Sequence, residues 1–100
     1  MKEISSLREK LLEDMKSAMA NKEEEKLSVI KMARAAIKNE EIEKRKDLED
    51  SEVVEVLLRE IKERYDAMEE YKKAGEKDMV DKLSREIKII SAYLPEEFRD

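Results

Sequence analysis

The sequence predicts an all-α protein, an up-and-down four-helix bundle-like domain, and three observations lead to that prediction. Charged residues make up 49% of the 100 residues and apolar residues 40%, a composition typical of long helices. Apolar residues recur every three or four positions, which is the spacing of one helical face. Gly75 and Pro95 are the only glycine and the only proline, so few positions can break a helix. One domain is expected over residues 1–100.

The first two helices are expected at residues 6–20 and 22–45. Ser6 and Glu9 have the spacing of a capping box, and Asn21 is a candidate N-cap of the second helix. Each helix carries one apolar stripe and is therefore expected to bury one face. The stripes comprise Ile4, Leu7, Leu11, Met15 and Ala18, and then Val29, Ile30, Met32, Ala33, Ala36 and Ile37.

The third and fourth helices are expected at residues 51–74 and 78–94. Asp50 or Ser51 is the candidate N-cap of the third helix, Gly75 is placed to end it, and Pro95 is placed to stop the fourth. Short connections make successive helices antiparallel neighbours, so this part of the chain is expected to form a helical hairpin. The stripes comprise Val54, Leu57, Leu58, Ile61, Tyr65 and Met68, and then Met79, Leu83, Ile87, Ile90 and Leu94.

The residue inventory argues against catalysis by this chain alone. Histidine and cysteine are absent, which removes the commonest general base, the thiol nucleophile and the usual metal ligands. A single glycine excludes a glycine-rich phosphate loop. No cofactor and no metal site are therefore expected.

The sequence offers no feature typical of a membrane or secreted protein. No apolar run approaches the roughly 20 residues that span a bilayer, and the first residues lack the apolar stretch of a signal peptide. The polar helix faces are mixed or acidic, unlike those of helices that lie on a membrane surface. A cytoplasmic location and no membrane partner are expected.

A basic stripe on the second helix is the candidate nucleic-acid contact. Lys31, Arg34, Lys38 and Arg45 fall within about 60° of one another around the helix axis. Such a row could follow a phosphate backbone. The competing interpretation is an ordinary solvated helix face, which the net charge of −5 and the lack of interleaved aromatic residues favour.

Most other charges are explained by pairs along a helix. Six acid-first i,i+4 pairs are expected, each contributing roughly 0.2–0.5 kcal/mol. They are Glu40–Lys44, Glu41–Arg45, Glu55–Arg59, Glu60–Arg64, Glu69–Lys73 and Asp78–Lys82.

Arg64 and Glu86 lie at the margins of two apolar stripes and at similar heights once the chain folds back at Gly75. We therefore predict an interhelical ion pair that fixes the register of the hairpin, against the alternative of two independent surface charges.

Several segments together resemble the YqeY-like proteins, also called the GatB/YqeY domain family. They are Leu27-Ser28-Val29-Ile30-Lys31-Met32, Lys38-Asn39-Glu40-Glu41-Ile42, Glu70-Tyr71-Lys72-Lys73-Ala74-Gly75, Asp78, Glu86-Ile87 and Tyr93-Leu94-Pro95. Gly75, Pro95, Tyr71 and Tyr93 are the hairpin and capping residues of this pattern. Two features depart from it. Glu76 stands where the family commonly has Arg, and members usually continue past the Leu-Pro for about another 50 residues as a C-terminal helical domain that is absent here.

The resemblance implies a small cytosolic bacterial protein without its own catalytic apparatus. Its relatives include the tail of the tRNA-dependent amidotransferase B subunit, which helps to hold tRNA. The expected function is a non-catalytic module that is tRNA-related or accessory to a glutamine-dependent amidotransferase (a carbon–nitrogen ligase). The partner would be tRNA or the amidotransferase complex. The alternative is a protein-interaction or scaffold bundle with no nucleic-acid role, which would use an exposed apolar groove and might self-associate.

Overall fold

The computed structural model describes residues 6–99, and all the regular secondary structure in that range is helical. The helices are α1 (Ser6–Ala20), α2 (Glu24–Lys44), α3 (Asp50–Lys73) and α4 (Lys77–Ser91), followed by the short 3-10 helix η1 (Glu96–Phe98). The all-α, four-helix prediction is confirmed. The expected boundaries agree to within two residues, except that α4 ends three residues earlier than expected. Ile4 lies outside the described residues, and the assignment of residues 1–100 to one domain stays a prediction.

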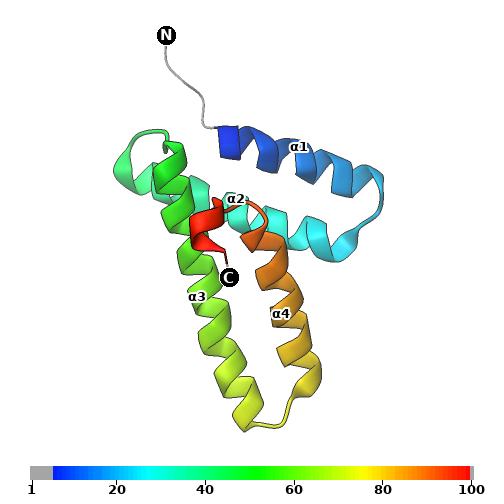
Figure 1. Cartoon of the computed structure of the whole chain (residues 1–100). Helices are drawn as coiled ribbons and strands as arrows, with labels where there is room; N and C mark the ends of the chain where they lie inside the picture. The colour runs from blue at the N-terminus through cyan, green and yellow to red at the C-terminus, as the bar shows by residue number, and fades with distance from the viewer. Residues whose placement is uncertain (1–5, 100) are drawn as a thin grey trace.

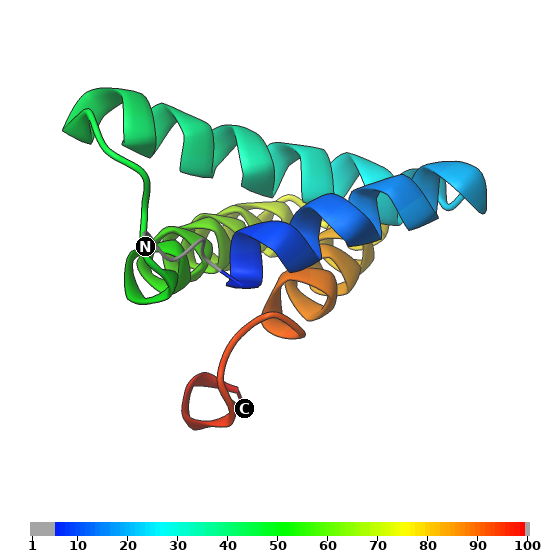
Figure 2. The same ribbon diagram turned by 90° about the horizontal axis from the view of Figure 1, so that it is seen from above.

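The four helices form two antiparallel hairpins that cross (Figure 1). The α1–α2 hairpin lies across one end of the α3–α4 hairpin, and the turn between α3 and α4 lies at the far end. Figure 2 shows the same crossing from above, with η1 set apart from the four helices. Because the α3–α4 hairpin extends beyond the crossing, the molecule is elongated, with extents of 52 × 30 × 26 Å.

The hydrophobic core is confined to the crossing. Its members come from all four helices and from the connections at 45–49 and 92–95, and none of residues 65–85 is buried. The half of the α3–α4 hairpin beyond the crossing is therefore a two-helix arm with a half-buried apolar seam. The buried residues include Leu11, Val29, Ile30, Ala33, Leu48, Val53, Leu57, Ile90 and Leu94.

Two members of the predicted stripes are exposed. The side chain of Met32 is 48% exposed, and that of Tyr65 is 45% exposed. Both predictions of burial are wrong for the same reason, because a helical stripe is buried only where another helix covers it. Tyr65 begins the arm beyond the crossing, and Met32 lies at its edge, with its sulfur 3.8 Å from Arg64 Nη2.

The N-terminus of α1 is capped by a residue from another hairpin. Ser6 Oγ donates to Asp50 Oδ2 at 2.7 Å, and the Leu7 amide donates to Asp50 Oδ1 at 3.1 Å. The backbone amide of Leu7 at the start of α1 is therefore capped by Asp50 and not through the predicted Ser6–Glu9 capping box. Asp50 is not the N-cap of α3 either, since that position is Glu49, whose amide donates to Glu52 Oε1 at 3.1 Å. An acidic group at a helix N-terminus also suits the helix dipole.

The turn between α1 and α2 differs from its prediction. Lys22 adopts a positive φ of 58°, and the Glu23 amide donates to the Ala18 carbonyl at 2.9 Å. This is a Schellman ending for α1, and it makes Glu23 the N-cap of α2. Asn21 is not the N-cap of α2, and its side chain donates to Ser17 Oγ of α1 at 3.3 Å.

Gly75 ends α3 as predicted. Its φ is +73°. The Glu76 amide donates to the Tyr71 carbonyl at 2.9 Å, and the Gly75 amide donates to the Lys72 carbonyl at 3.1 Å. These two bonds define a Schellman motif, which needs a residue in the left-handed region. Glycine is therefore favoured at position 75 because of its positive φ. Steric room is not the reason, since a Cβ at this position would have no atom within 4 Å.

Pro95 does not directly stop α4, which ends at Ser91. The intervening residues leave the helix because Tyr93 and Leu94 both turn into the core, where they are buried. Pro95 follows with a φ of −57° and leads into η1.

We predict that Gly75→Ala destabilises the protein by about 1 kcal/mol, because an L side chain in the left-handed region is strained even in open space. Gly75→Asn should cost less, since Asn tolerates this conformation. Urea denaturation of the two variants and the parent protein measures both values. An Ala variant as stable as the parent would show that the positive φ is not required.

Candidate functional site

The residues of the predicted basic stripe lie on α2 and at its C-terminal end. Lys31 and Lys38 are exposed, Arg34 is half-buried, and Arg45 follows the C-terminus of the helix with a φ of 56°. Arg34 contacts α1 through a hydrogen bond that its Nη1 donates to Met15 Sδ at 3.3 Å. Within residues 6–99, none of these four cations forms an ion pair with a carboxylate. The stripe therefore presents uncompensated positive charge on an acidic protein.

The cations next to the stripe behave differently. Lys44 and Lys46 both lie near Glu52 Oε2, at 3.5 and 3.1 Å, and Lys44 also pairs with Glu40 at 3.4 Å. Arg45 lacks its predicted partner because Glu41 pairs with Arg8 of α1 at 3.2 Å. Tertiary contacts thus neutralise the neighbours of the stripe and leave the stripe itself unpaired.

A groove between α1 and α2 borders the stripe. It has a volume of about 350 Å³ and is lined by both hydrophobic and charged residues, among them Arg8, Arg34 and Lys38. Glu41 lies at its base, where its buried carboxylate accepts bonds from Arg8 and from the Leu48 amide at 3.0 Å. Glu41 therefore connects α1, α2 and the segment before α3, which is a structural role that its spacing in the sequence did not reveal.

Arg64 and Glu86 meet as predicted, with Arg64 Nε donating to Glu86 Oε1 at 3.0 Å. Both residues are buried, and the exposed fraction of Arg64 is 5%. Arg64 Nη1 also donates to the carbonyl and the side chain of Glu60, at 3.0 and 3.2 Å. The guanidinium is therefore neutralised inside the structure, while its control of the hairpin register stays a prediction.

The two predicted tyrosines have structural positions. Tyr71 is half-buried in the arm, and its carbonyl closes the turn at Gly75. Tyr93 is buried, and its hydroxyl donates to Asp14 Oδ2 of α1 at 2.6 Å. Burial of the ring, together with this hydrogen bond, raises the pKa of the Tyr93 phenol. Tyr93 thus stays neutral and connects the end of α4 to α1.

Exposed ion pairs link the two hairpins. Arg85 of α4 binds Glu25 of α2 through two bonds of 2.8 and 3.1 Å, and Arg59 of α3 lies 3.2 Å from Glu40 of α2. The hydrogen bonds from these arginines hold the pKa of Glu25 and of Glu40 below the usual 4.5. The guanidinium of Arg59 is thereby directed away from Glu55, its predicted partner on α3.

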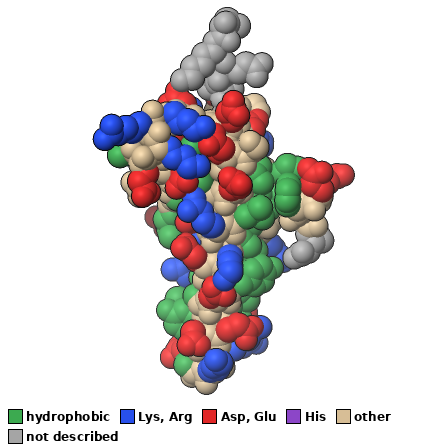
Figure 3. All heavy atoms as spheres, turned by 90° about the vertical axis from the view of Figure 1, so that its left-hand side faces the viewer, with side chains coloured by type: hydrophobic (Ala, Val, Ile, Leu, Met, Phe, Trp, Pro, Cys, Tyr) green, Lys and Arg blue, Asp and Glu red, His purple; other side chains and the backbone are tan. Residues whose placement is uncertain are grey.

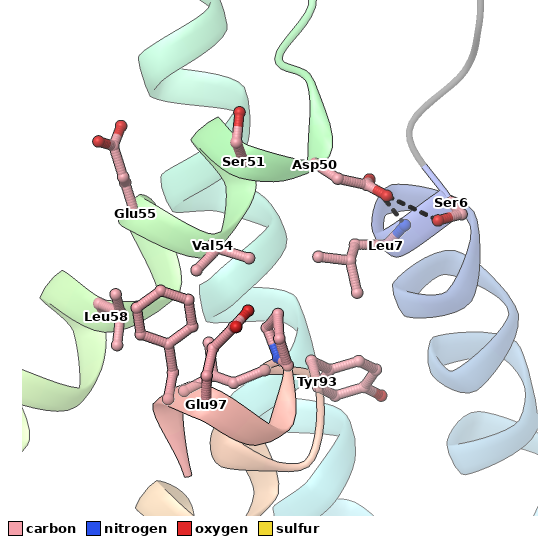
Figure 4. A pocket seen from close by; sticks show the side chains of 12 residues that line it. Ser6, Leu7, Asp50, Ser51, Val54, Glu55, Leu58, Tyr93 and Glu97 are labelled. Carbon is pink, nitrogen blue, oxygen red and sulfur yellow. Dashed lines mark hydrogen bonds between the residues drawn. The ribbon is translucent and has the colours of Figure 1, made fainter.

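A second concave surface was not predicted as a particular site. It is an apolar groove of about 740 Å³ between the start of α1, one side of α3 and the C-terminal segment, and we call it the apolar groove (Figure 4). Val54 and Leu58 of α3 line one side, and Leu7 and Tyr93 line the other. The groove joins residues from three separate parts of the chain, so no local pattern could have located it.

Two kinds of site are absent from residues 6–99. No group of three or more Asp or Glu side chains is placed to hold a metal ion. No helix in this part of the chain is long and apolar enough to cross a membrane.

Comparison with known proteins identifies relatives of this chain. The family model described as Yqey-like protein matches residues 8–100. The protein "Altered inheritance of mitochondria protein 41, mitochondrial" of Kluyveromyces lactis is 36% identical over 84 residues, which are 83% of this chain and 45% of that protein. Proteins of the same name from Lachancea thermotolerans and Eremothecium gossypii are 34% and 32% identical over 85 residues. The chain spans about half the length of these curated relatives.

These relatives overturn two expectations from the sequence. A bacterial protein was expected, whereas the curated relatives come from yeasts. A cytoplasmic location was expected, whereas the relatives are named as mitochondrial proteins. The default assignment failed because it rested on the absence of a membrane segment and of a secretory signal, and neither absence distinguishes the cytoplasm from an organelle.

We predict that removing one partner of the buried pair, as in Glu86→Leu, destabilises the protein by about 3 kcal/mol, because Arg64 loses its interhelical carboxylate in a buried site. The double variant Arg64→Met/Glu86→Leu should lose less than the sum of the two single changes. The exposed pair Lys62–Asp66 is the matched control, and its cycle should show little coupling. Additive effects at Arg64 and Glu86, measured by urea denaturation, would contradict the pairing.

Proposed function

Because the chain belongs to the YqeY-like family, we propose that it is a non-catalytic accessory module that contacts tRNA through the basic stripe of α2, in association with a glutamine-dependent amidotransferase. The observation that supports the RNA contact is that three cations of α2 and one at its C-terminal end form no ion pair with a carboxylate within residues 6–99. They are Lys31, Arg34, Lys38 and Arg45.

The dimensions of the stripe suit a nucleic-acid backbone. A helix rises about 1.5 Å per residue, so the stripe extends over about 20 Å. Each cation that neutralises a phosphate releases a counterion, which favours binding at low salt. Because these cations have no acidic partner within residues 6–99, contact with phosphate would break no ion pair in that part of the chain.

The net charge of −5 limits how the molecule can approach RNA. Surfaces rich in carboxylates repel phosphate, so contact is restricted to the stripe and the groove beside it. We therefore expect weak binding that depends steeply on salt. This expectation fits an accessory module, which assists a partner enzyme and does not hold RNA alone.

The names of the relatives supply the location for this proposal. They are mitochondrial proteins, and we place the proposed role in mitochondria. A second candidate function, a protein-interaction module without an RNA role, is favoured by the apolar groove.

We predict that Lys31→Glu/Lys38→Glu lowers the affinity for tRNA by at least about tenfold. It should also reduce the slope of log K against log salt by about 1 to 2, because two phosphate contacts are lost. Fluorescence anisotropy with labelled tRNA over a range of salt concentrations measures both quantities.

Lys77→Glu/Lys88→Glu on α4 is the control, since it changes the net charge equally at two other exposed lysines. It should weaken binding much less than the stripe variant. Equal losses in the two variants, or no tRNA binding by the parent protein at low salt, would overturn the proposed RNA contact.

A further inference from the structure

We propose that the apolar groove is a docking site for a basic amphipathic helix of a partner protein. This inference specifies the partner of the interaction-module candidate. It does not depend on RNA binding, because the apolar groove shares no residue with the basic stripe or with the groove between α1 and α2.

The apolar surface of the groove is both deep and accessible. Val54 and Leu94 are buried beneath it, Leu58 is half-buried, and the side chain of Phe98 is 47% exposed at its wall. On the face shown in Figure 3, hydrophobic side chains gather between α3 and the C-terminal turn, and acidic side chains lie at the outer end of that turn. An exposed aromatic beside an aliphatic floor is the kind of surface that a partner covers.

The charged residues that line the groove all have one sign. Its lining includes Asp50, Glu55 and Glu97, and no lysine or arginine. Asp50 already binds the start of α1, whereas Glu55 and Glu97 are exposed and have no ion pair within residues 6–99. In Figure 4, Glu97 lies between α3 and Tyr93, and Glu55 stands at the outer edge of the groove.

The nearest cations along the chain do not pair with these two carboxylates. Arg59, one turn after Glu55, pairs with Glu40 of α2 at 3.2 Å. Arg99, two residues after Glu97, donates to the carbonyls of Leu94 and Ala92 at 2.8 and 3.2 Å. Glu55 and Glu97 therefore have no cationic partner within residues 6–99, and both lie beside an apolar surface.

The apolar surface and the two carboxylates together favour one kind of ligand, a basic amphipathic helix. An amphipathic helix places apolar side chains at i, i+3, i+4 and i+7 into such a groove, and its flanking lysines or arginines would meet the two carboxylates. Anionic lipid and nucleic acid would bring negative charge against the same carboxylates, which disfavours both. The groove therefore suits a basic helix better than a membrane or an RNA.

The test uses labelled helical peptides of about 18 residues, or five turns, with leucines on one face and lysines on the flanks. We expect this peptide to bind at least about tenfold more tightly than the same peptide with glutamates in place of the lysines. Glu55→Lys/Glu97→Lys should reverse that preference. Phe98→Ala should weaken binding of the lysine peptide, whereas Ile42→Ala, which truncates an exposed apolar residue of α2, should not.

Glu43→Lys/Glu63→Lys is the charge-matched control, since both glutamates are exposed and lie outside the groove. If it weakens peptide binding as much as Glu55→Lys/Glu97→Lys does, the attraction is nonspecific and the proposal fails. The proposal also fails if Phe98→Ala leaves the affinity unchanged, or if the protein binds vesicles of anionic phospholipid more tightly than the lysine peptide. Circular dichroism of each variant verifies that its helices are intact.

Discussion

The buried guanidinium of Arg64 links α2, α3 and α4, and we predict that the arrangement of the two hairpins depends on it. A buried charge is costly unless an opposite charge lies beside it. The guanidinium of Arg64 is neutralised by the carboxylates of Glu86 on α4 and Glu60 on its own helix. Its Nη2 lies beside the sulfur of Met32 on α2. Three helices therefore have to meet at one place. The core ends there as well, since the arm that begins at residue 65 contains no buried residue as far as residue 85.

This arrangement also decides which charges remain unpaired. Once the hairpins cross, Arg59 and Arg85 reach across to glutamates of α2, and Glu41 is used by Arg8 and the Leu48 amide. The basic stripe of α2 and the carboxylates Glu55 and Glu97 at the apolar groove are among the charges that have no ion pair within residues 6–99. The proposed RNA contact and the proposed protein contact therefore have opposite charge, and the two grooves share no residue.

Local patterns predicted the helices and the glycine turn because these depend on neighbouring residues. The Arg64–Glu86 contact was predictable because both residues flank apolar stripes on helices that Gly75 makes antiparallel. The i,i+4 rule succeeded for Glu40–Lys44 and Glu60–Arg64 and failed for Glu55–Arg59, because Arg59 had a partner on another helix. The Asp50 cap, the buried role of Glu41 and the apolar groove arise from contacts between distant segments, which no spacing in the sequence encodes.

The two proposals give one module two separate binding surfaces of opposite charge. The most direct measurement is backbone-amide NMR of the labelled protein, titrated in one sample with tRNA and in a separate sample with the lysine-flanked helical peptide, because the peptide itself would bind tRNA. We expect tRNA to shift the resonances of residues 31–45 and the peptide to shift those of Val54, Leu58, Glu97 and Phe98. Shifts from both ligands at the same residues would contradict two separate surfaces.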